Sequence, residues 1–181
     1  PIEGARHLNI RMIDVRHTVA DTPVMGISGK WKICSTGTGT PIGIINSSFG
    51  GTPIESWIKK PVLESDANFK PILDNYEKHL AHYPQKHEEH LMKMDAWHRD
   101  TSANKGRTPA APIGPKSSIS PCKLYNGMIA PLLNYAIADV IWRQDEANVK
   151  DPYLYQKLFS ALIRSWRSDF KNDTLPFCTN D

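Results

Sequence analysis

The stretch "VIWRQDEAN", residues 140–148, changes from an apolar strand pattern to a dense polar cluster with no turn residue between them. Val140, Ile141 and Trp142 are typical of a strand buried in a sheet, and the polar residues follow at once. In open α/β sheets, the carboxyl ends of the strands are the usual position of a ligand site. The stretch therefore predicts a sheet strand that ends at a site.

A second stretch has the same order of apolar and polar residues. "PIGIIN", residues 41–46, is a short strand pattern, and the polar "SSFGG" follows it. Thr52, Pro53 and Glu55 then match the cap, first helical and third helical positions of a capping box, so we expect a helix from Thr52 to about Lys60. A glycine turn before a helix start aims backbone N–H groups at an anion or an oxyanion.

The rest of the chain alternates between strand and helix patterns. We expect strands at residues 7–15 and 136–142 and the beginning of another at 175–177, whereas 16–40 is irregular and ends in the flexible "STGTGT". Asp151 and Pro152 begin an amphipathic helix with an apolar residue at every fourth position, namely Leu154, Leu158, Leu162, Trp166 and Phe170. This alternation predicts an α/β fold with a mainly parallel sheet, in which the loops after 41–46 and 136–142 converge at one edge.

Residues 63–121 interrupt this alternation. Helical spacing runs from 63 to 100 with a break at Pro84, which predicts a helical hairpin, and the stretch 101–121 is rich in Pro, Ser and Gly and predicts an extended surface connection. Residues 124–133 predict a short helix that is interrupted at Pro131. We therefore expect one domain, residues 1–181, with a helical insertion at about 63–121.

Composition excludes several classes of function. The chain has 181 residues, enough for one domain, and its 22 basic and 19 acidic residues are mixed along it with a net charge of +3, which argues against nucleic acid as a partner. No apolar run approaches the roughly 18 residues of a membrane span. Cys34, Cys122 and Cys178 match neither a disulfide framework nor a metal knuckle. His87 and His90 lack the spacing of a zinc motif, so we expect no metal and no cofactor.

Some polar and aromatic residues have a simpler interpretation than a site. Ser47 and Ser48 lack the surroundings of a nucleophile elbow, so we expect them to be loop hydrogen-bonders. Trp57, Trp142 and Trp166 stand in strongly patterned elements and are predicted to be core residues, although a Trp beside a pocket can also stack on a sugar.

Two long motifs together resemble a known family. "PIGIINSSFGGTPIESWI" (41–58) and "LYNGMIAPLLNYAIADVIWRQDEAN" (124–148) closely resemble the sialate O-acetylesterase family of the SGNH hydrolases. The resemblance extends from about Asn9 to Phe177. It implies a three-layer α/β/α fold with a mostly parallel, flavodoxin-like sheet. It also implies removal of acetyl groups from sugar hydroxyls by serine acyl transfer, with sialic acid or another glycan as the partner. A secreted, periplasmic or lysosomal location is suggested by this resemblance alone.

The resemblance also implies site residues. Gly50 or Gly51 would present a backbone N–H to the oxyanion, Gln144 would offer its side-chain amide, and Glu146 and Asn148 would shape the pocket. Donors that are fixed before the charge develops are each worth about 10²-fold or more in rate.

The chain departs from the family pattern at several points. The family's Gly-Gln-Ser-Asn-Met nucleophile motif is absent, and so is the His that the family usually carries in an Asp-x-x-His pattern near the carboxyl end, so no nucleophile or base is assigned. Asp145 stands where the family has Gly, and its charge at about 4 Å would oppose an oxyanion by roughly 4 kcal/mol. We therefore expect a truncated member that is inactive on its own. The alternative is a catalytically inactive remnant that binds carbohydrate or protein.

Overall fold

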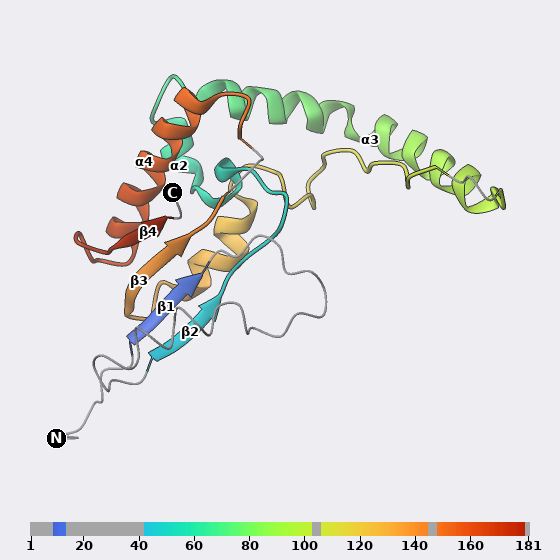
Figure 1. Ribbon diagram of the computed structural model, residues 1–181. Coiled ribbons are helices and arrows are strands. Elements are labelled where there is room, and N and C mark those ends of the chain that lie inside the picture. Colours follow the sequence, from blue (N-terminus) through green and yellow to red (C-terminus); the bar gives the residue numbers. More distant parts are fainter. Residues whose placement is uncertain (1–8, 14–41, 103–105, 145–147, 180–181) are drawn as a thin grey trace.

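Four strands form one parallel sheet in the computed structural model, which describes residues 9–13, 42–102, 106–144 and 148–179 (Figure 1). The order across the sheet is β2-β1-β3-β4, and all three pairings are parallel. This order matches the first four strands of the flavodoxin-like doubly wound fold, so the predicted α/β class and sheet type are confirmed. The strands are β1 (Asn9–Ile13), β2 (Ile42–Asn46), β3 (Ile137–Trp142) and β4 (Phe177–Thr179).

The register explains why two distant loops can meet. Strand β1 lies between β2 and β3, and Ile13 is in register with both Asn46 and Ile141. Strands β2 and β3 therefore end at the same level of the sheet, about 10 Å apart across two strand spacings. Their following loops leave from the same edge, as the parallel arrangement predicted. The expected loop 16–40 lies outside the described residues.

Three tryptophans form the centre of the core. Helix α4 (Pro152–Asp169) begins at Asp151, whose carboxylate accepts from Leu154 N at 2.9 Å, as predicted. On its buried face, Trp166 meets Trp142 of β3 edge to face, with ring centroids 5.8 Å apart. Trp142 makes a similar contact with Trp57, at 6.1 Å, and all three side chains are buried. Edge-to-face pairs of this kind stabilise a core beyond their buried area, and the predicted core role of these residues is confirmed.

The helix predicted from Thr52 to Lys60 is wrong in extent and in its cap. The structure has a short 3₁₀ helix, η1 (Ile54–Trp57), and then helix α2 (Lys60–Glu64). Pro53, not Thr52, occupies the cap position, and no local side chain caps η1. The Thr52 hydroxyl instead donates to Phe49 O at 2.7 Å and accepts from the Trp57 indole at 3.1 Å.

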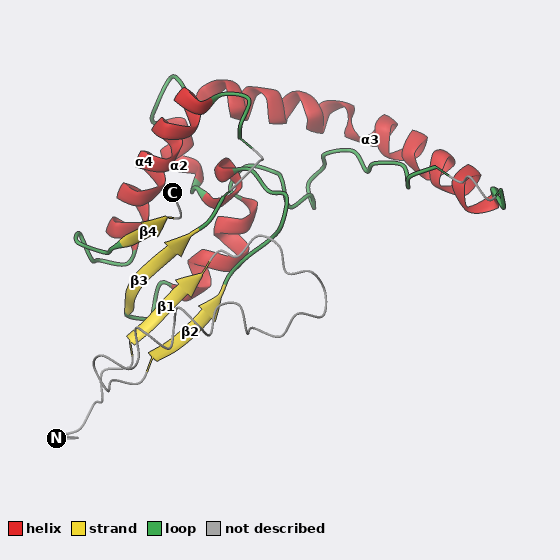
Figure 2. Cartoon of the chain, viewed as in Figure 1, coloured by secondary structure: helices red, strands yellow, loops and turns green. Residues whose placement is uncertain are grey.

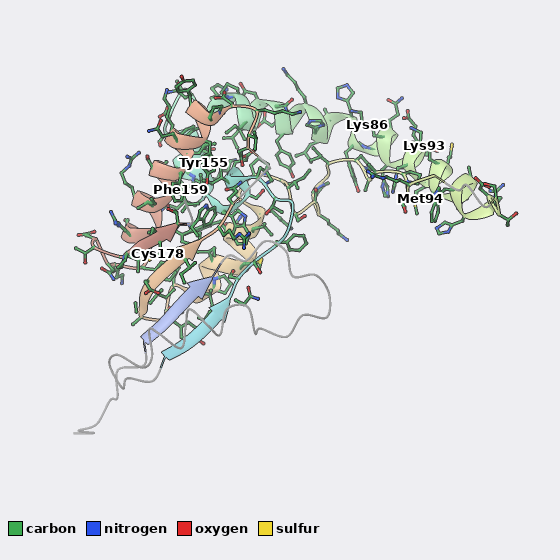
Figure 3. The ribbon with its side chains drawn as sticks, in the orientation of Figure 1. Lys86, Lys93, Met94, Tyr155, Phe159 and Cys178 are labelled. Atoms are coloured by element: carbon green, nitrogen blue, oxygen red, sulfur yellow. The ribbon has the colours of Figure 1, made fainter. Side chains whose placement is uncertain are left out.

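The insertion is one long helix followed by an extended return. Helix α3 (Lys70–Arg99) continues through Pro84, so the predicted break is wrong, and residues 106–121 run back beside it as loops and turns (Figure 2). The Trp97 indole donates to Gly106 O at 2.8 Å. The Tyr83 ring occupies the space into which a side chain at Gly114 would project. No residue within α3 is buried, and Lys86, Lys93 and Met94 lie far from the sheet, whereas Tyr155 and Phe159 of α4 lie beside it (Figure 3).

The return from the insertion closes on the core. Cys122 has a positive φ of 63° and donates its backbone N–H to Glu55 O at 2.9 Å. The chain then forms the π-helical turn η2 (Tyr125–Ile129) and the 3₁₀ turn η3 (Ala130–Leu132). A short helix was predicted here, but the predicted interruption at Pro131 is wrong, because Pro131 lies within η3 and the helix type changes at Ala130. The Tyr125 hydroxyl donates to Asp169 at the end of α4 at 2.6 Å. Burial and this hydrogen bond raise the pKa of Tyr125, so the phenol stays protonated.

Candidate functional site

The loop after β2 is held in a fixed turn by its own side chains. Ser48 Oγ donates to Asn46 Oδ1 at 2.7 Å, as expected for a loop hydrogen-bonder, and the Thr52 hydroxyl closes the turn on Phe49 O. Gly51 has a φ of +71°, a conformation that glycine adopts readily and other residues adopt at a cost. Gly50 and Gly51 are exposed, and no described residue accepts a hydrogen bond from their backbone N–H groups. Their N–H groups are therefore free to bind a ligand.

Asn148 joins this loop to the loop after β3. Its Oδ1 accepts from the backbone N–H of Ile54 at 2.9 Å, and its Nδ2 donates to Glu55 Oε2 at 3.1 Å. The side chain therefore supplies the cap that Thr52 was predicted to supply. It also uses the carboxylate of Glu55, which was predicted to reach its own cap. Residues 94 positions apart hold each other in place, which confirms that the two loops converge.

Gln144 strengthens the same junction. Its Nε2 donates to Asn148 Oδ1 at 2.6 Å and to Thr52 O at 3.4 Å, so both amide hydrogens have acceptors inside the protein. Its Oε1 is buried and has no partner among the described residues, and the same is true of Ser47 Oγ at the end of β2. Buried polar atoms are nearly always hydrogen-bonded. These two oxygens are therefore available to a water molecule or to a polar ligand.

The predicted site residues are thus brought together in part. Gly50, Gly51, Gln144 and Asn148 all belong to the two joined loops. Glu146 lies outside the described residues, as does its neighbour Asp145. Glu55 was assigned only a local capping role from the sequence. Its contact with Asn148 is a long-range one, for which the sequence holds no local signal.

A groove of about 860 Å³ adjoins the joined loops. Its sheet-side wall contains Gly51, Pro53 and Glu55 from the first loop and Lys150 from the second. Its opposite wall comes from the insertion, from both helix α3 and the return segment. Pockets that hold small molecules usually measure about 300–1,000 Å³. The groove therefore lies beside the loops that follow β2 and β3 at the carboxyl edge of the sheet, the edge at which α/β folds usually bind ligands, and it is large enough for one.

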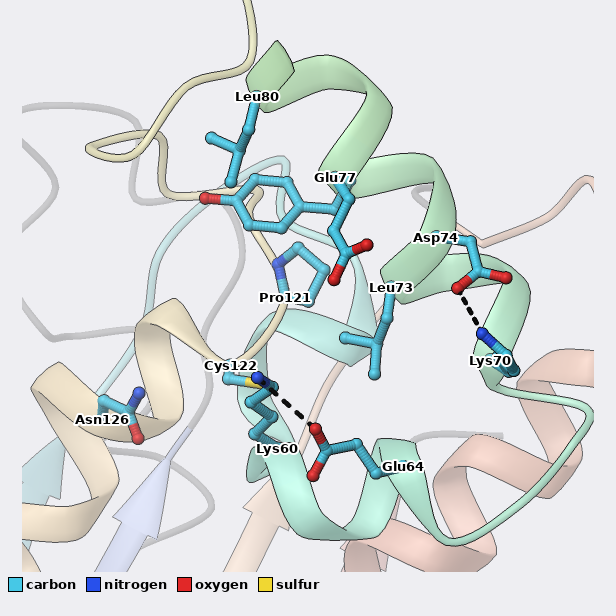
Figure 4. Close-up of a pocket in the computed structure, with 11 residues that line it drawn as sticks. Lys60, Glu64, Lys70, Leu73, Asp74, Glu77, Leu80, Pro121, Cys122 and Asn126 are labelled. Atoms are coloured by element: carbon cyan, nitrogen blue, oxygen red, sulfur yellow. Dashed lines mark hydrogen bonds and ion pairs between the residues drawn. The ribbon is translucent and has the colours of Figure 1, made fainter.

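A second cavity of about 490 Å³ lies between α2, α3 and η2 (Figure 4). Two exposed ion pairs, Lys60–Glu64 and Lys70–Asp74, stand at its rim. Cys122 is buried in its wall, and burial raises the pKa of this thiol to about 11. A thiol with a raised pKa is a weak nucleophile at neutral pH, so this cavity has no reactive group of that kind to offer.

The histidines of α3 are dispersed. His87 stacks on Tyr83 with ring centroids 5.2 Å apart. Among the described residues, no group of three or more His, Cys, Asp or Glu side chains is arranged to hold a metal ion. Within the same residues, no helix is long and apolar enough to cross a membrane.

A parallel α/β sheet in flavodoxin-like order, with its polar loops joined beside a groove at the carboxyl edge, is the SGNH-hydrolase type of architecture. The fold is similar to that of a carbohydrate acetylesterase from Xanthomonas citri, with a TM-score of 0.51 and 28% identity over 82% of this chain and 23% of that one. No protein-family model matches the chain.

Curated relatives define the family more closely. Sialate O-acetylesterase of Rattus norvegicus is 33% identical over 132 residues, which cover 72% of this chain and 22% of the rat protein. That of Homo sapiens is 30% identical over 131 residues, which cover 72% of this chain and 18% of the human protein. The chain belongs to the sialate O-acetylesterase family, and it spans about a fifth of the length of these relatives.

Proposed function

We propose that this chain forms the oxyanion-binding and pocket side of a carbohydrate O-acetylesterase, which hydrolyses acetyl esters on sugar hydroxyls by serine acyl transfer. The observation that carries the proposal is the junction at Asn148, because it fixes the Gly50–Gly51 turn beside a groove of about 860 Å³. The relatives are named sialate O-acetylesterase and carbohydrate acetylesterase. The substrate is therefore an acetylated sugar, either sialic acid or another glycan.

The proposed chemistry assigns each residue a distinct role. Attack on an acetyl ester places negative charge on the carbonyl oxygen, and the backbone N–H groups of Gly50 and Gly51 stabilise that charge. Such donors contribute only if they are held still before the charge develops. Gln144 and Asn148 supply that rigidity, since their amides bind Thr52 O, Ile54 N and Glu55. Glu146 is assigned to the pocket on the basis of the family resemblance.

Titration calorimetry tests this proposal with two ligands, O-acetylated sialic acid and the same sugar without its acetyl group. We expect the acetylated sugar to bind with a dissociation constant of about 1 mM or less, which corresponds to about −4 kcal/mol. The deacetylated sugar should bind at least several-fold more weakly. A flat trace with both sugars at millimolar concentration would overturn the proposal.

A second candidate function is a binding module without hydrolysis. It is favoured by the sequence itself, in which no Gly-Gln-Ser-Asn-Met motif occurs and no Asp-x-x-His pattern follows residues 95–98. An aryl acetate assay separates the two candidates. Turnover that a serine-directed inhibitor abolishes would assign the complete reaction to this chain. Retained sugar binding without turnover above that of a heat-denatured sample would assign the binding role.

A further inference from the structure

The groove beside the joined loops has a second wall that the family motifs do not contain. Helix α3 contributes Ile72, Asn75, Tyr76 and His79 to this wall. Asn75, Tyr76 and His79 follow Ile72 by three, four and seven positions, a spacing that places all four residues along one face of a helix. Ile72, Tyr76 and His79 are half-buried, whereas His82, one turn further along the helix, is exposed. This face of α3 is therefore turned toward the groove.

Tyr76 and His79 do not belong to the hydrophobic core, although Ile72 on the same face packs against it. No residue within α3 is buried, and the side chains by which the helix packs against the core are Ile72 and Leu73 rather than Tyr76. Tyr76 also borders the second cavity, which places its ring between two open spaces. A half-buried aromatic ring at the edge of a groove offers a flat apolar surface with a polar tip. Asn75 and His79 add an amide and an imidazole beside it.

The chemistry of the whole groove suits a sugar that is longer than one residue. The sheet-side wall supplies the carboxylate of Glu55 and the ammonium of Lys150, and the α3 wall supplies the aromatic and amide groups. The volume of about 860 Å³ lies near the upper end of the range for small-molecule sites, which is about 1,000 Å³. The groove thus extends well beyond the Gly51 turn, where an acetyl group would be bound.

Building on the proposed function, we infer that Tyr76 and His79 form a specificity subsite for the sugar residue that is linked to the acetylated one. Tyr76 stacks on the ring of this second sugar, and His79 hydrogen-bonds one of its hydroxyls. The ligand class is therefore an acetylated glycoside rather than a free acetylated monosaccharide. The two residues are specificity-determining, because they do not touch the ester.

Paired titrations test the inference. The probes are O-acetylated sialic acid and the disaccharide in which this acetylated sugar is linked to galactose. The parent chain should bind the disaccharide about tenfold more tightly. Tyr76→Ala and His79→Ala should each reduce this preference at least threefold and leave monosaccharide affinity within twofold of the parent value.

Matched variants exclude a general effect. Tyr153→Ala removes a tyrosine that is 81% exposed on α4, and His82→Ala removes an exposed histidine of α3. Both should keep the full preference for the disaccharide. Tyr76→Phe keeps the stacking ring and should also keep most of the preference, which provides a test if Tyr76→Ala does not fold.

The possible outcomes separate this inference from the proposed function. If neither sugar binds to the parent chain, the proposed function fails and the inference falls with it. If both sugars bind equally to the parent chain, only the inference is overturned. It is also overturned if the control variants lose the preference as much as Tyr76→Ala and His79→Ala do.

Discussion

Two regions of the molecule, the sheet with its joined loops and the insertion, each contain a tryptophan whose indole N–H donates to a backbone carbonyl. The surroundings of the two tryptophans differ. In the core, the Trp166 indole donates to Trp57 O at 3.1 Å, and on α3 the Trp97 indole donates to Gly106 O at 2.8 Å. Trp166 is 2% exposed and packed against other rings, whereas Trp97 is only half-buried. Burial rather than hydrogen bonding therefore distinguishes the two regions, because a hydrogen bond alone contributes only about 1 kcal/mol.

The largest expected effect follows directly from this comparison. Trp166→Ala should lower the free energy of unfolding by about 3–5 kcal/mol, the range for a large buried aromatic side chain. Trp97→Ala should lower it by about 1 kcal/mol or less. Urea denaturation followed by circular dichroism measures both values. If the two losses were equal, α3 would be as much a part of the cooperative core as α4 is.

The next effect concerns the junction between the loops. Asn148→Leu should cost about 2–3 kcal/mol, because the Ile54 N–H and the Glu55 carboxylate lose their partner in partly buried positions and Gln144 loses the shorter of its two hydrogen bonds. The matched variant Asn134→Leu changes an exposed asparagine and should stay within about 0.5 kcal/mol of the parent chain. Thermal denaturation compares the two, and similar stabilities would mean that the junction contributes nothing.

A third test uses Cys122, which lies where the insertion returns to the core. Its pKa is raised from 9.0 to about 11 by burial, so at pH 8 about 100-fold less thiolate forms than at an ordinary thiol. In a Cys34→Ser, Cys178→Ser variant, the remaining thiol should react with a thiol reagent at least about 100-fold more slowly than in the same variant unfolded in urea. A rapid reaction in the folded state would mean that the return segment opens readily.

The same thiol gives a pH dependence with a definite sign. Because the folded pKa lies above the unfolded one, the folded state holds its proton longer. The contribution to stability is complete below about pH 9 and is lost as the pH rises toward 11. Melting temperatures of the parent chain should therefore fall more steeply across this window than those of a Cys122→Ala variant.

The smallest effect distinguishes two adjacent glycines. A residue with a side chain at the Gly51 position must adopt a left-handed conformation, so Gly51→Ala should cost about 1–2 kcal/mol. At Gly50, an added Cβ meets nothing within 4 Å and φ does not lie in that region, so Gly50→Ala should change stability by less than about 0.5 kcal/mol. Equal melting temperatures for the two variants would contradict the assigned turn geometry.

Much of the sheet and of the α4 packing could be predicted from the sequence because both depend on local patterns. Strand β3 follows from its β-branched and aromatic residues, and the start of α4 follows from Asp151 and Pro152. The meeting of the two loops also followed, since parallel strands bring their carboxyl ends to one edge. The spacing of apolar residues along the chain and the geometry of a parallel sheet were together enough to predict these features.

The start of η1 could not be predicted, because a residue far along the chain decides it. Thr52 satisfies the local rule for a cap, but Asn148 caps Ile54 instead, and Thr52 turns back to Phe49. The predicted helix break at Pro84 was wrong for a related reason. A proline removes one helix hydrogen bond at a cost of about 3 kcal/mol, yet α3 continues through it, with Tyr83 packed against Gly114 of the return segment. Such long-range contacts have no signature in a short window of sequence.

The contact between Cys122 N and Glu55 O, at 2.9 Å, brings the two ends of the excursion from the core together. Lengthening an excursion whose ends are already closed costs little, about 0.6 kcal/mol for each doubling of its length. Most of α3 and its return could therefore be shortened, extended or exchanged between homologues while the strands and the joined loops keep their positions. In this architecture, one wall of the groove can change by exchange of a single module, while the edge of the sheet that carries the joined loops stays the same.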